Sequence, residues 1–219
     1  MIDSLLHLNF RNGDIKNINN YLNSDGYEWS KRRQTMLLSV DNTKIENCEC
    51  NYLKDYENCF SKFVRGVKDD DLVFIFISGH GYQKYNKEEK DNYDEYISFN
   101  SGNITDNILY SSLIEKLKDT AKRIVCLTDT CHSGTMFDLD EKTVYKRNIF
   151  SISACLDNQL DSCDISNVGF GGSLTVHLLD ISNSLSLLLN KDESSIKSLI
   201  GSLKNKLKLL GQDPQLIII

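Results

Sequence analysis

Leu72–Ser78 reads LVFIFIS and is followed at once by Gly79-His80-Gly81. The run is apolar until its last residue, and aspartates at positions 69–71 precede it. A short β-branched and aromatic run with such boundaries predicts a strand buried on both faces, as in parallel sheets. Arg123–Thr128 (RIVCLT) and Asn148–Ala154 (NIFSISA) predict two more strands of this kind.

Around these strands, apolar residues recur at helical spacing. Tyr52–Val67 carries a wide apolar stripe at i, i+3 and i+4, which is typical of an amphipathic helix. Similar patterns predict helices over Gly13–Leu22, Ile108–Leu117, Ser173–Leu189 and Ser194–Leu210, and shorter strands over Thr35–Val40, Tyr96–Phe99 and Gln215–Ile219. This alternation predicts an α/β fold with a mostly parallel sheet and helices on both faces. Because no linker or internal repeat divides the chain, residues 1–219 are predicted to form one domain.

The composition narrows the function classes. The formal net charge of −6 and the pI of about 5.2 argue against nucleic acid as a partner. No apolar run approaches the roughly 20 residues that cross a membrane, and the first residues do not resemble a signal peptide. The seven cysteines are scattered along the chain. Without an export signal, we expect them to be reduced thiols of a cytoplasmic protein.

Reactive side chains follow two of the predicted strands. His80 follows the first, and Cys131 follows the strand that ends near Asp129. If the strands are neighbours, a thiol and an imidazole face each other, which is the minimal set for acyl transfer. Backbone N–H groups of Gly81 and Cys131 could then form an oxyanion hole. Each residue alone is also typical of a core position, and His132 is an alternative base, although adjacent side chains diverge.

Together, these two motifs resemble those of caspase-like peptidases, and most closely those of metacaspases. Ser151–Cys155 with Asp157 is similar to the third strand and following loop of that family. Gly171–Thr175 is similar to its glycine-led helix start, and Gln212–Leu216 to its entry into the last strand. The likeness covers roughly residues 12–219. It implies a three-layer caspase-like fold and a monomeric cysteine-type endopeptidase with a Cys131–His80 dyad.

The resemblance also implies cleavage of peptide or protein substrates after Arg or Lys. Asp129 and Asp14 match acidic positions of the family's primary specificity pocket, Ser153 matches a residue that lines it, and Asp157 borders it. A buried carboxylate pair suits a guanidinium, because the cation relieves the repulsion between the carboxylates. Asp14 also fits a role at a helix start, where the helix dipole favours an acid.

Many metacaspases need calcium, and the resemblance implies a calcium site here and no organic cofactor. The matching residues are Asp94, Asp106, Asn107 and Asp138. Calcium binds several oxygen ligands at one point, which three carboxylates and an amide oxygen would supply. Asn107 replaces an aspartate of the family pattern and removes one charge. The alternative is a set of solvated loop residues.

One departure from the family leaves the function open. Met1–Phe10 (MIDSLLHLNF) is a short and polar version of the family's first strand, so that strand is expected to be missing or degenerate. An incomplete sheet would favour a second hypothesis, a non-catalytic caspase-like module that binds peptides or partners without cleaving them. A third hypothesis is a related peptidase with a different specificity pocket.

Overall fold

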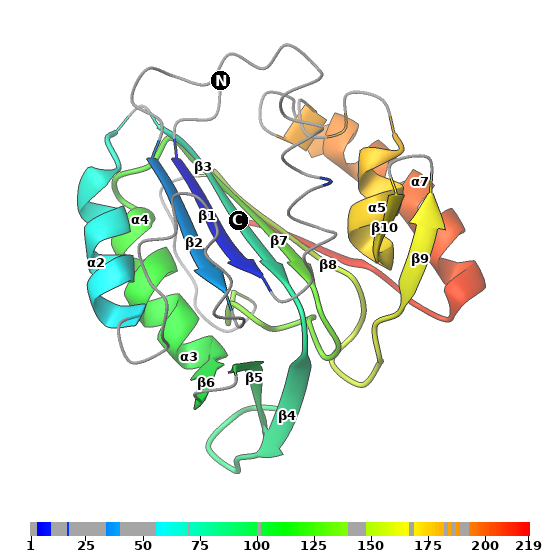
Figure 1. The fold of residues 1–219 in the computed structure, drawn as a ribbon, viewed down its shortest axis with the longest axis horizontal. Coiled ribbons are helices and arrows are strands. Elements are labelled where there is room, and N and C mark those ends of the chain that lie inside the picture. Colours follow the sequence, from blue (N-terminus) through cyan, green and yellow to red (C-terminus); the bar gives the residue numbers. More distant parts are fainter. Residues whose placement is uncertain are drawn as a thin grey trace.

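The computed structural model describes residues 4–9, 17, 34–39, 56–69, 71–99, 102–139, 148–166, 169–181, 184, 187–188 and 193–219. Its central sheet has six strands in the order β11-β8-β7-β3-β1-β2 (Figure 1). Neighbours are parallel except β11, which is antiparallel to β8. The strands are β1 (Ser4–Asn9), β2 (Gln34–Ser39), β3 (Leu72–Ser78), β7 (Arg123–Asp129), β8 (Asn148–Ser153) and β11 (Gln215–Ile218).

The continuous apolar runs of the central strands serve two cores. Along β3, Val73, Ile75 and Ile77 belong to one buried cluster. Phe74 and Phe76, which point to the opposite face, belong to the other. This division follows from the two-residue period of a strand, and a strand that is covered on both faces needs apolar residues at every position.

Helices cover both faces of the sheet (Figure 1). On one face lie α2 (Tyr56–Gly66) and a continuous helical segment made of α3 (Asp106–Leu109), the π-helix η2 (Tyr110–Ile114) and α4 (Glu115–Leu117). On the other lie α5 (Ser173–Leu179) and α7 (Glu193–Leu207), followed by the 3₁₀-helix η3 (Lys208–Leu210). The three-layer α/β architecture expected from the sequence is therefore confirmed.

Two small antiparallel units adjoin the carboxyl ends of the central strands. One is a three-stranded sheet of β4 (Gly81–Tyr85), β5 (Tyr93–Phe99) and β6 (Gly102–Thr105), which begins directly after β3. The other pairs β9 (Cys163–Ser166) with β10 (Gly169–Gly172), which leads into α5. Both units consist of short, polar or glycine-rich segments. Because such segments lack an apolar pattern, the sequence did not predict β4, β6, β9 or β10.

The expectation of a missing first strand is wrong. β1 pairs in parallel with both β3 and β2, so it lies inside the sheet. Polar residues did not prevent this strand, because backbone hydrogen bonds to two neighbours define it. The predicted helix over residues 173–189 is also too long, since α5 ends at Leu179 and residues 184 and 187–188 are helical again.

Three further predictions, on the cysteines, on membrane-spanning segments and on the helix over Gly13–Leu22, can be compared with the structure. Cys59 is disulfide-bonded, so the expectation that every cysteine is reduced is wrong there. No helix within the described ranges is long and apolar enough to cross a membrane. The predicted helix over Gly13–Leu22 lies outside the described residues except for Asn17, which is helical and buried.

Candidate active site

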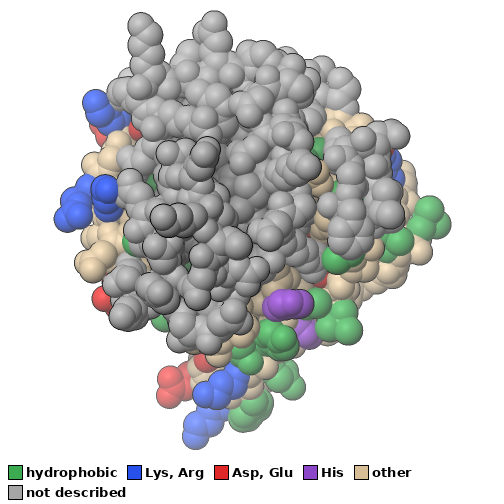
Figure 2. Space-filling model, viewed as in Figure 1, with side chains coloured by type: hydrophobic (Ala, Val, Ile, Leu, Met, Phe, Trp, Pro, Cys, Tyr) green, Lys and Arg blue, Asp and Glu red, His purple; other side chains and the backbone are tan. Residues whose placement is uncertain are grey.

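The register of the sheet brings the two predicted catalytic segments together. Ser78 is paired with Asp129 at the carboxyl ends of β3 and β7. His80 and Cys131 each follow two residues beyond this pair, on neighbouring strands. The His80 side chain is exposed and Cys131 is half-buried. Histidine side chains reach the surface among hydrophobic ones on the face shown in Figure 2.

Gly81 packs directly against the Cys131 backbone. A Cβ atom at this glycine would lie 2.1 Å from the Cys131 carbonyl oxygen and 2.8 Å from Thr130 Oγ1. The two segments are held by hydrogen bonds as well, because the Gly79 N–H donates to the Asp129 carbonyl oxygen at 3.2 Å. Position 81 therefore has no room for a side chain, and the two strand ends form one packed unit.

The Cys131 sulfur faces the loop that follows β8. The backbone N–H of Asp161 donates to Cys131 Sγ at 3.2 Å. The neighbouring His132 turns away, since it adopts a left-handed backbone with φ of 52° and its ring Nδ1 hydrogen-bonds the Asp157 carbonyl oxygen. The His132 ring thus has a partner other than the sulfur, which leaves His80 as the stronger candidate base.

The pocket residues predicted from the family likeness do not all share one surface. Asp129 is fully buried, and its Oδ2 accepts hydrogen bonds from the Thr175 N–H at 2.7 Å and from the Thr175 hydroxyl at the start of α5. Ser153 is buried at the end of β8, next to Thr128 of β7. Asp14 lies outside the described residues. Asp129 therefore has a structural role, because its hydrogen bonds join α5 to β7.

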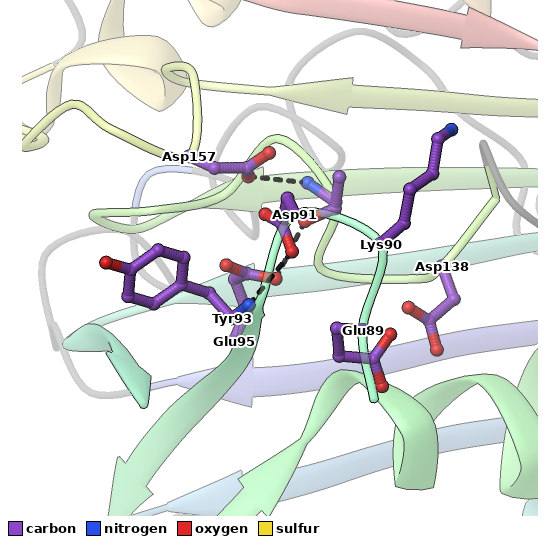
Figure 3. Close-up of a pocket in the computed structure, with 8 residues that line it drawn as sticks. Glu89, Lys90, Asp91, Tyr93, Glu95, Asp138 and Asp157 are labelled. Atoms are coloured by element: carbon purple, nitrogen blue, oxygen red, sulfur yellow. Dashed lines mark hydrogen bonds between the residues drawn. The ribbon is translucent and has the colours of Figure 1, made fainter. Parts of the chain in front are cut away.

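Asp157 belongs to a different surface, an acidic pocket of about 300 Å³ beside the Cys131 loop (Figure 3). Its Oδ1 accepts from the Thr135 N–H at 2.8 Å, and the Thr135 hydroxyl donates to Glu95 Oε2 at 2.8 Å. Burial raises the pKa of Glu95 to about 7. Carboxylates dominate the lining, and the Lys90 side chain extends away from them in Figure 3. The full lining is Glu89, Lys90, Asp91, Tyr93, Glu95, Thr135, Asp138 and Asp157.

The four predicted calcium ligands lie near this pocket in two pairs. Asn107 Nδ2 donates to Asp94 Oδ1 at 3.4 Å and to Glu89 Oε1 at 2.9 Å. Asp106 is buried, and its carboxylate accepts from the N–H groups of Glu95 and Asn107. Burial and the nearby charge of Asp138 raise the pKa of Asp106 to about 8.

As arranged, these residues form a hydrogen-bonded network. The described part of the chain contains no group of three or more His, Cys, Asp or Glu side chains placed to hold a metal ion. The Asn107 amide presents N–H groups to the carboxylates, whereas calcium requires oxygen ligands. The residue types suit a calcium ion, but this arrangement does not fit one without reorganisation.

The sequence profile of the metacaspase, peptidase C14 domain family matches residues 7–140, which include both predicted catalytic residues. The chain belongs to this family. Metacaspase III c of Phaeodactylum tricornutum is 34% identical over 134 residues, which cover 58% of this chain and 37% of that protein. Metacaspase-1 of Botryotinia fuckeliana is 31% identical over 136 residues, covering 58% and 30%. The match thus spans about a third of these metacaspases.

The fold likeness extends further along the chain than the sequence likeness. A crystal structure of a protein from Geobacter sulfurreducens superposes with a TM-score of 0.63 and covers 98% of this chain and 93% of that one. The sequence identity is 17%, so this similarity concerns the fold. The family profile does not match the region after residue 140. The fold likeness to the Geobacter sulfurreducens protein nevertheless includes it.

Sequence reasoning missed several polar residues that hold the site. Thr175, Thr135 and Asp161 make hydrogen bonds to Asp129, Asp157 and the Cys131 sulfur. Each lies in a turn or at a helix start, where short polar residues are common for purely local reasons. The only available signal was the position of these turns after predicted strands, and this position does not specify their partners.

Proposed function

We propose that this protein is a cysteine endopeptidase in which Cys131 is the nucleophile and His80 the general acid and base. It cleaves peptide or protein substrates after Arg or Lys and is activated by calcium. The observation that carries the proposal is the register of Ser78 with Asp129, which sets a half-buried thiol and an exposed imidazole at adjacent strand ends. Membership of the metacaspase family supports the same chemistry.

The proposed reaction proceeds through a thioester. The Cys131 thiol gives its proton to His80, and the sulfur attacks the carbonyl carbon of the scissile peptide bond. The imidazolium then protonates the departing amine as the C–N bond breaks. In the second stage, His80 accepts a proton from water while the water oxygen attacks the thioester. Collapse of this second intermediate releases the carboxylate product and the thiol.

The backbone of Gly81 is suited to binding the oxyanion. The Ser98 N–H donates to the His80 carbonyl oxygen, so His80 and Ser98 form a hydrogen-bonded pair of the antiparallel ladder. The next pair, Gly81 with Ile97, is then a non-hydrogen-bonded pair, and its N–H groups are directed away from the ladder. An N–H that binds the oxyanion contributes about 3–4 kcal/mol to the transition state.

Negative charge around the Cys131 segment supports a preference for basic residues. The Asp129 carboxylate lies at the end of β7, two residues before Cys131, and the Asp157 carboxylate accepts from the Thr135 N–H in the loop that follows. A cationic substrate side chain gains from such charges when it is shielded from water. Ser153 also belongs to the proposed primary pocket, and the family likeness adds Asp14, which lies outside the described residues.

Calcium activation is a separable part of the proposal, because no chemical step passes through the ion. The motive is the concentration of carboxylates at Asp94, Asp106 and Asp138, together with Asn107 and the acidic pocket. The raised pKa of Asp106 reflects repulsion from Asp138 in addition to burial, and a bound cation would remove that repulsion. Binding requires the Asn107 amide to rotate so that its oxygen faces the ion.

The test uses peptide reporters that differ only at the residue before the cleaved bond: Arg, Lys, or citrulline, an uncharged analogue of Arg. We expect turnover of the Arg and Lys reporters, at least 10²-fold slower turnover of citrulline, and no turnover by Cys131→Ala or His80→Ala. Measurements with calcium and with chelator separate activation from chemistry. Equal turnover by Cys131→Ala would refute the proposed nucleophile, and equal cleavage of citrulline would refute the specificity.

The completed sheet bears on the non-catalytic alternative. That hypothesis was motivated by an incomplete first strand, and β1 is paired on both sides. With both dyad residues present and β1 paired inside the six-stranded sheet, no observation on the described residues favours a scaffold without activity.

A further inference from the structure

The loop after β8 contacts the proposed nucleophile through its backbone. The Asp161 N–H lies 3.2 Å from Cys131 Sγ, and the sulfur lies 3.9 Å from the Asp161 carbonyl oxygen. The N–H of the next residue, His132, donates to the Gln159 carbonyl oxygen at 3.0 Å. The loop therefore runs alongside the Cys131 segment and presents an N–H donor to the sulfur.

The side chain of Asp161 fixes the position of that N–H. Its Oδ1 accepts from Gln212 Nε2 at 2.7 Å, from the Ser162 N–H at 2.8 Å and from Ser173 Oγ at 3.2 Å. Gln212 and Ser173 are almost completely buried. Gln212 in turn accepts from Ser162 Oγ at 2.9 Å and from the Ser173 hydroxyl.

This network joins three parts of the fold behind the sulfur. Ser173 is the first residue of α5, and Gln212 lies in the turn between η3 and β11. Gln159 Oε1 accepts from the N–H groups of Leu156 and Asp213, which ties the start of the loop to the same turn. Buried hydrogen bonds of this kind hold a loop in one conformation.

We propose that Asp161 is a positioning residue for the nucleophile: Gln212 and Ser173 hold its carboxylate so that its backbone N–H donates to the Cys131 sulfur. A hydrogen bond to the sulfur favours the thiolate over the thiol, and the thiolate is the reactive form. The inference deepens the proposed function and rests on Cys131 being its nucleophile. Its test measures the thiol directly, so it does not require peptidase turnover.

The effects of other ionisable groups of the site must be separated from this one. Burial raises the pKa of Cys155 to about 11, so this neighbouring thiol stays protonated over most of the accessible pH range. The negative charge of Asp161 opposes thiolate formation, whereas its N–H favours it. Asp161→Asn separates the two, because the amide oxygen can still accept from Gln212 and Ser173 while the charge is removed. His80, if it carries a proton, acts in the same direction as the N–H.

The experiment is the pH dependence of alkylation of Cys131 by iodoacetamide, followed by peptide mass spectrometry. Both substitutions remove the charge, but only alanine removes the acceptor that Gln212 and Ser173 hold, so we expect the midpoint of the pH–rate profile of Asp161→Ala to lie about one pH unit above that of Asp161→Asn. Below the midpoint the rate should fall about threefold, because a tenfold loss of thiolate is partly offset by its higher nucleophilicity. Asp161→Asn should leave the midpoint unchanged or lower it. Asn205→Ala, an exposed position on α7 near Gln212, is the matched control.

An Asp161→Ala profile that matches that of Asp161→Asn would overturn the proposal. So would faster alkylation than in Asp161→Asn, because the loop would then cover the sulfur and not support it. If Asp161→Ala fails to fold, Gln212→Ala replaces it, with a shift in the same direction expected. A folded Gln212→Ala protein without that shift also contradicts the proposal. A shifted Asp161→Ala alkylation profile, together with a wild-type protein that turns over none of the peptide reporters, would count against the proposed function alone.

Discussion

Gly81→Ala tests the contact between the two catalytic segments. The added methyl carbon would lie 2.1 Å from the Cys131 carbonyl oxygen and 3.1 Å from its carbonyl carbon, whereas ordinary contacts begin at 3.4 Å. Both atoms belong to the backbone, so no side chain can rotate to make room. The β3–β4 and Cys131 segments must therefore separate by about 1 Å, which is enough to cost roughly 10²-fold in rate when catalytic groups are misplaced.

The same change should destabilise the fold. Inserting a methyl group into a closely packed site costs about 1–3 kcal/mol. Gly201→Ala is the matched control, since a Cβ at this exposed position of α7 meets nothing within 4 Å. It should stabilise the protein by about 0.5–1 kcal/mol, because glycine is unfavourable within a helix.

The assay compares both variants with the wild type by urea unfolding, by Cys131 alkylation and by turnover of the Arg reporter. We expect Gly81→Ala to be less stable and to react more slowly at Cys131, and Gly201→Ala to retain wild-type chemistry. A Gly81→Ala protein with wild-type stability and wild-type alkylation of Cys131 would refute the close packing on which the site is built.

Three further outcomes follow from the contacts of the site. Burial raises the pKa of Asp106 from 3.8 to about 8, so the folded protein retains a proton that the unfolded chain releases. The free energy of unfolding should therefore fall as the pH rises from about 4 to about 8. Asp106→Asn, measured by urea unfolding with chelator present, should reduce that fall. The same dependence of the free energy of unfolding on pH in both proteins would contradict the raised pKa of Asp106. Thr175→Val removes the hydroxyl that donates to the buried Asp129 carboxylate and should cost about 1–3 kcal/mol in the same assay, whereas no loss would show that the bond is dispensable. Gly134→Ala would place a Cβ 2.6 Å from Asp157 Oδ1, a side-chain atom that can move, so we expect it to slow turnover less than Gly81→Ala does, and an equal or larger loss would contradict this ranking.

The central strands could be predicted because their burial on both faces leaves a strong signal. β3 spans the predicted Leu72–Ser78, and β7 extends the predicted strand by one residue, to Asp129. The carboxyl ends of two such strands identify where a site can form, so His80 and Cys131 could be named from the sequence. Their adjacency depends on β3 and β7 being neighbours, which the order of the sheet supplies.

The supporting residues could not be predicted in the same way. Hydrogen bonds between Asp161 and Gln212, which are 51 residues apart in the chain, depend on how α5, α7 and β11 pack. The sequence of Gln212–Leu216 indicates only an entry into the last strand. The hydrogen bond from Gln212 to Asp161 depends on how distant segments pack. β1 was misjudged for a related reason, since pairing with two neighbours outweighed its polar composition.

Trapping of the acyl-enzyme tests the central claim most directly. The wild-type protein is mixed with an Arg-terminated peptide ester, quenched in acid within milliseconds to seconds, and mapped by mass spectrometry. The account predicts that the peptide is attached as a thioester to Cys131, and that no adduct forms there in His80→Ala. A peptide attached to another residue, or undiminished acylation of Cys131 without His80, would contradict the proposed dyad.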